Sequence, residues 1–249
     1  HDRELAGLIL GTRKLKKLKS LDHRFECANM TDKGVRNLAL QWDLSHLGVS
    51  FSFGPELTDL SFEFLKQRVL ELSSLQTLEI SLFSVDITNK GMVLLGLGLM
   101  NLPLLRSLKF RMEYSKKVTD DSFSALGQAL EKMSLLHTFD LQIAPGNNET
   151  VENLKSGIIK LKSLTNFHLD LRHGELTGPG LKCIEEMLPH LTNLRCFSFK
   201  FMSGSVHNPS YKEWTFSFQG LESLQSFYLG FPSYHTITAK EILKAMKGL

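Results

Sequence analysis

A short pattern of apolar residues, LxxLxLxL, recurs along this chain and constrains its fold more than any other feature. Its first leucine occurs at Leu18, Leu44, Leu75, Leu105, Leu136, Leu164, Leu194 and Leu224. The successive steps are 26, 31, 30, 31, 28, 30 and 30 residues. A nearly constant period of this length is typical of an array in which each unit is one supersecondary element stacked on the next. The pattern therefore predicts eight consecutive units over residues 18–249.

Each unit is predicted to begin with a β-strand. Apolar and polar residues alternate strictly within the pattern, as in LQTLEISL from Leu75 and LRCFSFKF from Leu194. This period of two is the signature of a strand that buries one face. The strands of all units should therefore share one buried side and one polar side.

A helix is predicted to follow most strands. Its signal is an apolar residue, then threonine, then often Asp or Asn, at Thr31, Thr58, Thr88, Thr119, Thr177 and Thr238. A threonine hydroxyl can accept a hydrogen bond from a free amide in the first helical turn, so we expect these residues to be N-caps. The apolar residues that follow have helical spacing, as in Phe123, Leu126 and Leu130.

Two units depart from this plan. In the fifth, a loop over residues 144–149 replaces the threonine signal and predicts a shortened helix from about Thr150. In the seventh, residues 202–218 contain the glycine, asparagine and proline of a loop, together with Tyr211 and Trp214. This segment is a candidate docking loop with Trp214 as its anchor. Alternatively, its aromatic side chains fill the gap that a missing helix leaves.

A period near 30 residues with a helix in the return segment resembles the ribonuclease-inhibitor-like class of leucine-rich repeats, over Leu18 to Leu249. The resemblance implies an α/β horseshoe-shaped solenoid with a parallel sheet on its concave face, helices on its convex face and a protein partner. That family usually has Asn or Cys at the ninth position of the pattern. Here the ninth position holds Glu26, Ser52, Phe83, Glu113, Ala144, Arg172, Met202 and Pro232. We therefore expect no asparagine ladder there, and strands that continue to a buried eighth residue such as Leu82 or Phe201.

The whole of residues 1–249 is predicted to be a single leucine-rich-repeat domain cut from a longer chain. Residues 1–17 resemble the end of a preceding repeat, and residues 18–249 form about eight repeats. The chain starts at His1 without a signal-peptide pattern, and a final helix from Ala239 to Leu249 has no polar capping repeat after it.

Composition and motifs argue against several functional classes. The net charge of +3 is too small for a dedicated nucleic-acid binder, and the three cysteines form no CxxC pair. No apolar run reaches the roughly 18 residues that span a bilayer. Walker, GxGxxG, HExxH and EF-hand patterns are missing. We therefore expect no metal, cofactor, nucleic acid, membrane or small-molecule substrate, and an intracellular, cytoplasmic location.

The candidate binding surface consists of polar side chains in rows across the concave face. These rows are formed by residues at the fifth, seventh and ninth positions of the pattern. Equivalent residues of neighbouring strands should lie roughly 4.8 Å apart. Their positive and negative charges nearly balance, which disfavours a phosphate backbone and favours specific recognition of a protein. The predicted partner-binding residues are Lys109, Arg111, Glu113, Asp140, His168, Asp170, Arg172, Lys200 and Tyr228.

The residues Asp140, His168 and Ser198 fall in one row and have the residue types of a serine-hydrolase triad. Catalysis is nevertheless not expected, because strand amides are committed to the sheet and an open face does not exclude water. The sequence predicts a non-catalytic protein-interaction module or a structural subunit of a larger assembly. The alternative is a regulatory or substrate-recognition segment of a larger enzyme, such as a kinase or a ubiquitin-ligase component.

Overall fold

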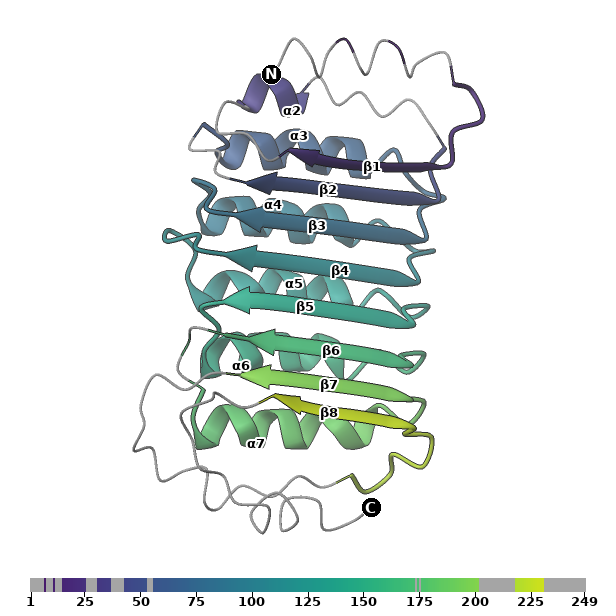
Figure 1. Ribbon diagram of the computed structural model, residues 1–249, viewed down its shortest axis with the longest axis vertical. Coiled ribbons are helices and arrows are strands. Elements are labelled where there is room, and N and C mark those ends of the chain that lie inside the picture. The colour runs from purple at the N-terminus through teal and green to yellow at the C-terminus, as the bar shows by residue number, and fades with distance from the viewer. Residues whose placement is uncertain are drawn as a thin grey trace.

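The computed structural model describes residues 7, 11, 15–25, 31–36, 43–52, 56–172, 174, 176–201 and 218–230. Within these residues, eight parallel strands form one sheet, in which the order of the strands is their order in the chain (Figure 1). The strands are β1 Ser20–Phe25, β2 His46–Ser52, β3 Thr77–Phe83, β4 Ser107–Glu113, β5 Thr138–Ala144, β6 Asn166–Leu171, β7 Cys196–Phe201 and β8 Ser226–Gly230.

The helices alternate with the strands along the chain and lie behind the sheet in Figure 1. They are α2 Asp32–Arg36, α3 Asp59–Val69, α4 Asn89–Leu99, α5 Phe123–Leu130, α6 Asn148–Ile158 and α7 Gly178–Met187. The short 3-10 helices η1 Asp120–Ser122 and η2 Leu188–His190 adjoin α5 and α7. Strand and helix repeated in this way form a leucine-rich-repeat solenoid, so the predicted fold class is confirmed. We call the side of the sheet that faces away from the helices the open face.

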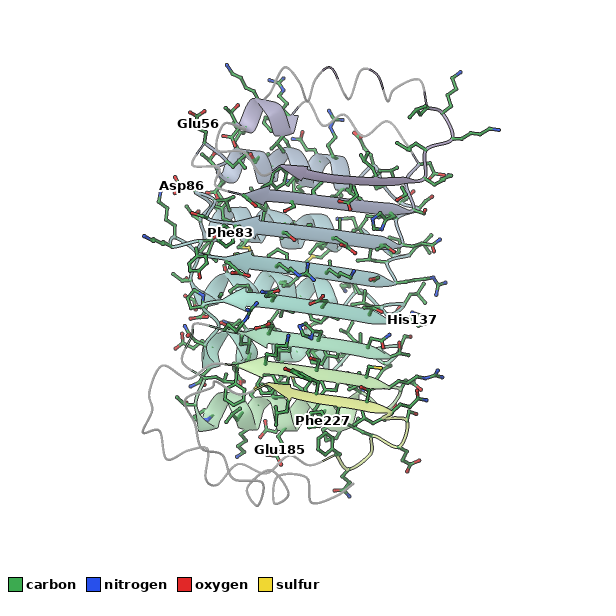
Figure 2. The ribbon with its side chains drawn as sticks, viewed as in Figure 1. Glu56, Phe83, Asp86, His137, Glu185 and Phe227 are labelled. Carbon is green, nitrogen blue, oxygen red and sulfur yellow. The ribbon has the colours of Figure 1, made fainter. Side chains whose placement is uncertain are left out.

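The core lies between the sheet and the helices and consists of columns of equivalent residues. One column is aromatic: the rings of Phe139 and Phe167 stack at 5.8 Å, those of Phe167 and Phe197 at 5.6 Å, and those of Phe197 and Phe227 at 5.8 Å. Phe227, labelled in Figure 2, lies at the β8 end of this column. Leu82 and Phe201 are buried at the eighth position, as predicted. Each large side chain buried in this way contributes roughly 1.5–3 kcal/mol.

The threonine signals mark helix starts, as predicted. The hydroxyls of Thr31, Thr58 and Thr88 accept hydrogen bonds from the amides two residues later, at 3.1, 3.3 and 3.2 Å. Thr119 and Thr177 occupy the N-cap positions of η1 and α7 without such a side-chain bond. Thr238 lies outside the described residues.

A polar ladder joins each helix start to the next repeat. Oδ1 of Asp59 accepts from the amides of Thr88 and Gly91, both at 2.9 Å, and Oδ2 accepts from the Thr88 hydroxyl at 2.7 Å. Asp32 does the same for Thr58 of the next repeat. The residues that follow the N-caps and accept hydrogen bonds from the next repeat are Asp32, Asp59, Asn89, Asp120 and Asn148, of which Asp120 accepts from the side chains of Asn147 and Thr150 and the others accept from a backbone amide. We call this set the cap ladder. It supplies polar links between repeats at the helix starts.

The fifth unit contradicts one prediction. Helix α6 spans 11 residues, as α3 and α4 do, so the expected shortening from Thr150 is wrong. The reason is that Asn147 takes the N-cap position, and its amide donates to the Thr150 hydroxyl at 3.1 Å in a capping box. Asn148 then continues the cap ladder by accepting from the amide of Thr177 at 2.8 Å. The Asn-Asn pair thus replaces the Thr-Asp pair of other units.

Some predictions concern residues outside the described ranges. These are the docking loop with Tyr211 and Trp214, the helix from Ala239 to Leu249, and the assignment of residues 1–17 to a preceding repeat. They remain predictions, as does the division of the chain into domains.

Neighbouring helices approach closely where glycines face each other. A Cβ on Gly157 of α6 would collide with the carbonyl oxygen of Gly127 in α5 and lie 2.8 Å from Cβ of Leu130. Only the missing side chain therefore allows the two helices this separation.

We predict that Asp59→Ala lowers the free energy of unfolding by roughly 2–3 kcal/mol, because the Thr88 and Gly91 amides lose their acceptor. Asp59→Asn should cost less, since asparagine already fills the equivalent position at Asn89. Urea unfolding measures both values. The matched control is Glu63→Ala in the same helix, which breaks the surface ion pair with Lys66 and a long, exposed hydrogen bond from Gln67 and should change stability by less than about 0.5 kcal/mol.

We also predict that Gly157→Ala destabilises the protein by roughly 1–3 kcal/mol through overpacking against α5. Intrinsic helix propensity alone predicts the opposite sign, a gain of about 1 kcal/mol. Ser156→Ala, at the exposed neighbouring position, is the control and should leave stability unchanged or slightly higher. Thermal unfolding of the two variants decides between packing and propensity.

Candidate functional site

The polar rows expected on the open face exist. The register of the strands makes the fifth-position residues consecutive partners, in the order Asp22, Gly48, Glu79, Lys109, Asp140, His168, Ser198 and Tyr228. The seventh-position row is Arg24, Ser50, Ser81, Arg111, Gln142, Asp170, Lys200 and Gly230. At the ninth position, Glu113 of β4 partners Ala144 of β5.

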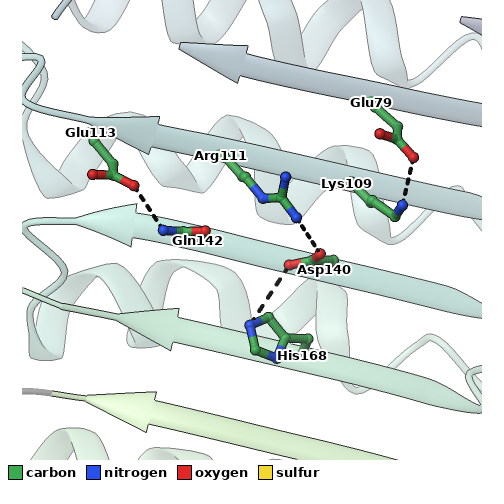
Figure 3. A network of polar contacts seen from close by, with 7 residues as sticks. All are labelled: Glu79, Lys109, Arg111, Glu113, Asp140, Gln142 and His168. Carbon is green, nitrogen blue, oxygen red and sulfur yellow. Dashed lines mark hydrogen bonds and ion pairs between the residues drawn. The ribbon is translucent and has the colours of Figure 1, made fainter. Parts of the chain in front are cut away.

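A network of cross-strand contacts holds the centre of these rows (Figure 3). Nζ of Lys109 donates to Glu79 at 2.6 Å, and Nη2 of Arg111 contacts Oδ2 of Asp140 at 3.1 Å. Lys109 is the register partner of Asp140, but its ammonium group bonds to Glu79 on the other side. Each pair joins neighbouring strands, and side chains of opposite charge placed in this way stabilise a sheet.

Glu113 completes this network through a neutral partner. Nε2 of Gln142 donates to Oε1 of Glu113 at 2.7 Å, again between β4 and β5 (Figure 3). The Glu113 carboxylate is therefore held in place without being neutralised.

His168 and Asp140 lie side by side without a hydrogen bond. Nε2 of His168 is 4.0 Å from Oδ1 of Asp140, beyond hydrogen-bonding distance. That oxygen is buried and has no hydrogen-bond partner. The spacing matches an ion pair that forms when the ring is protonated.

Burial is the main influence on the pKa of His168 and lowers it from the ordinary value of 6.5. The Asp140 and Asp170 carboxylates raise this pKa, while the positive charges of Lys200 and Arg111 lower it further. The net effect favours a neutral ring at pH 7.

Asp170 is buried and contacts Arg172 instead of facing solvent. Its side chain is only 3% exposed, and one oxygen accepts from Nε of Arg172 at 2.8 Å. The carboxylate therefore orients Arg172, whose own side chain is 40% exposed. Of these two predicted binding residues, Arg172 is the one that a partner can reach.

Lys200 and Tyr228 form a pair at the β7–β8 end of the open face. Nζ of Lys200 lies 5.4 Å from the centre of the Tyr228 ring, within cation–π range. The tyrosine is 53% exposed. Cation and ring thus form one surface feature.

A hollow opens on this face across strands β4 to β8, with about 500 Å³ of empty space. The residues that line it include the predicted Lys109, Asp140, His168 and Tyr228, and the third-position residues Thr138, Asn166, Cys196 and Ser226. We call it the β4–β8 hollow. The third-position residues were missed as site residues because they are short and mostly uncharged, although their regular place two residues before the fifth-position row could have revealed them.

Another hollow, of about 530 Å³, lies farther along the open face and is lined by Asp22, Gly48, Val49, Ser50, Glu79, Ser81 and Arg111. Among the described residues, no group of three or more His, Cys, Asp or Glu is arranged to hold a metal ion. Burial raises the pKa of the Cys183 thiol to about 12, so this thiol is not a nucleophile at neutral pH. Within the same residues, no helix combines the length and the apolar character that a membrane span needs.

Comparison with known proteins does not identify a family. No family model and no curated protein matches the sequence. Among solved structures, the chain is similar to the tropomodulin C-terminal domain of Caenorhabditis elegans, with 13% identity over 63% of this chain and 92% of that chain and a TM-score of 0.43. It is also similar to the yeast Rad7 and Elc1 complex, with 13% identity over 84% of this chain and 87% of that chain and a TM-score of 0.21.

We predict that His168 titrates below 6.5 and that its neighbours shift it in opposite directions. Lys200→Met should raise the pKa of His168, because a repelling charge is removed, and Asp140→Asn should lower it, because an attracting charge is removed. The histidine ring signals followed by NMR against pH report each value. Lys182→Met, which removes a charge from helix α7, should leave this pKa unchanged; a rise in Asp140→Asn would contradict the prediction.

Proposed function

We propose that this chain is a non-catalytic protein-interaction module that binds its partner through the open face. The observation that carries the proposal is the set of cross-strand contacts Glu79–Lys109, Arg111–Asp140 and Glu113–Gln142, which orient charged side chains on a face turned away from the helices. The side chains of Lys109 and Arg111 are still 37% and 45% exposed.

Such pre-ordered charges suit recognition of a protein. Their side chains lose little further freedom when a partner docks, so less of the interaction energy is spent on ordering them. Alternating signs discriminate between partners by complementarity, and they do not favour the uniformly negative backbone of a nucleic acid. The same face would serve a structural subunit of a larger assembly.

Three finer assignments belong to this proposal. Helices in the return segments support placement in the ribonuclease-inhibitor-like class of repeats. The absence of catalysis is supported by the parallel ladder, whose pairing from Thr138 to Lys200 commits the strand amides around His168 and Ser198. The free thiols of Cys183 and Cys196 suit a reducing, intracellular compartment.

The test is affinity capture from the native cell with quantitative mass spectrometry. The open-face variant combines Lys109→Glu, Arg111→Glu and Lys200→Glu. The control combines Lys132→Glu, Lys160→Glu and Lys182→Glu, three exposed lysines on or next to helices. We expect the open-face variant to lose its partner roughly tenfold or more, because like charges then face each other across the interface, and the control to retain it.

Circular dichroism melting should first establish that both variants are folded. Asp170 is left unchanged in the design, because reversing a buried charge would disturb folding as well as binding. Capture of an unaltered set of partners by the open-face variant, or their loss only from the control, would refute the proposal.

A further inference from the structure

Lys200 differs from the other predicted basic residues of the open face. Lys109, Arg111 and Arg172 each contact a carboxylate within 3.1 Å. For Lys200, the described contact is the ring of Tyr228, and no carboxylate among the described residues lies within 4.0 Å of its ammonium group. Among the described residues, Lys200 is therefore a cation of the open face without a carboxylate partner.

Gly230 of β8 lets Lys200 reach this position. A Cβ on Gly230 would be 2.9 Å from Cγ of Lys200 and 3.2 Å from Cε1 of Tyr228. The lysine stem and the tyrosine ring therefore both pack over the glycine. The ammonium group is held at a defined place, and little of its freedom remains to be lost on binding.

The Lys200–Tyr228 pair adjoins the β4–β8 hollow. Tyr228, Ser198 and His168 line this hollow, and the neutral side chains Asn166 and Cys196 also line it. Of the two acidic residues nearby, Asp140 pairs with Arg111 through Oδ2 while its Oδ1 is buried without a hydrogen-bond partner, and Asp170 is 3% exposed and accepts from Arg172. A segment in the hollow that extends past the Tyr228 ring thus reaches Lys200, which has no carboxylate partner among the described residues, and lies along neutral polar groups and the already paired Asp140 and Lys109.

We infer that the β4–β8 hollow binds an acidic protein segment, one Asp or Glu carboxylate of which pairs with Lys200 while the neighbouring residues lie along His168 and Tyr228. The inference rests on the proposed function and names the chemistry of the partner. A carboxylate is favoured over a phosphate group because both guanidinium groups nearby, of Arg111 and Arg172, are already committed to carboxylates.

Binding of this kind is coupled to the protonation of His168. The titratable and charged groups around that ring are Lys109 and Arg111 from β4, Asp140 from β5, Asp170 from β6, Lys200 and Cys196 from β7, and Tyr228 from β8. Lys200 lowers the pKa of His168, so a carboxylate that pairs with Lys200 raises it. The complex then holds the proton more tightly than the free protein does. By linkage, affinity increases as the pH falls into the range, below about 6.5 in the free protein, in which His168 gains its proton, and it declines near pH 4 as the ligand carboxylates become protonated.

The experiment uses the 249-residue chain and a nine-residue Gly/Ser peptide that carries three glutamates. Matched peptides carry glutamine, lysine or phosphoserine at the same places. An NMR titration gives the affinity, the location of the shifted signals and the pKa of His168. We expect saturable binding of the glutamate peptide, roughly tenfold weaker binding of the glutamine peptide, and shifts centred on Ser198, Lys200 and Tyr228.

The variants separate a specific contact from general attraction. Lys200→Met should weaken binding of the glutamate peptide roughly tenfold, whereas Lys200→Arg should restore most of it. Lys182→Met removes the same charge from helix α7, where the side chain is 76% exposed, and should leave binding unchanged. His168→Gln should retain binding at pH 7.5 and lose the increase in affinity that protonation of His168 produces below about pH 6.5.

Equal binding of the glutamate and glutamine peptides, or equal losses in Lys200→Met and Lys182→Met, would overturn the inference. Binding of the phosphoserine peptide tenfold tighter than that of the glutamate peptide would indicate a phosphorylated segment as the ligand and would also overturn the inference. If the glutamate peptide fails while the open-face variant still loses its captured partner, only the partner chemistry is wrong. If the capture experiment also shows no effect, the proposed function fails as well.

Discussion

Parallel pairing of equivalent residues across β1 to β8 is the constraint on which the rest of this structure depends. Because Leu78 pairs with Leu108 and Phe167 pairs with Phe197, each apolar position becomes a continuous buried column. The same register aligns Lys109 with Asp140 and His168 on the opposite side. A slip of one residue would exchange the two sides, so the apolar columns and the polar rows are two consequences of one pairing.

The register is kept although the repeats differ in length. Steps between the repeats range from 26 to 31 residues, and the difference is absorbed between the strands, for example by η1 before α5. The cap ladder tolerates this variation because it uses only the first residues of each helix, where Asp59 reaches Thr88 and Asn148 reaches Thr177. Helices α3, α4, α5 and α6 each end six residues before the first leucine of the next pattern, so the difference in repeat length among these units lies between each strand and the start of the helix that follows it.

On the open face, the basic side chains differ in whether they contact a carboxylate. Three basic side chains find carboxylates on their own or a neighbouring strand, while Lys200 lies over Gly230 and contacts an aromatic ring. For the proposed partner, the paired charges would supply specificity, and Lys200, without a carboxylate partner among the described residues, would favour a negatively charged group. His168 lies between the two regions, next to an oxygen of Asp140 that has no hydrogen-bond partner.

The periodicity of the chain was sufficient to predict the strand order, the register, the buried columns and the membership of the polar rows, because a period-two pattern repeated at one spacing admits only one alignment. The sequence also carries a signal for the start of α6 that the threonine pattern overlooked, because the Asn147–Asn148 pair makes the same kinds of hydrogen bond as a Thr-Asp pair. The three-dimensional packing decided which partner each charge takes. Lys109 bonds to Glu79 instead of Asp140, and Asp170 is buried and accepts a hydrogen bond from Arg172. Long side chains can reach several neighbours at nearly equal cost, so their choice depends on the packing around them and not on their place in the repeat.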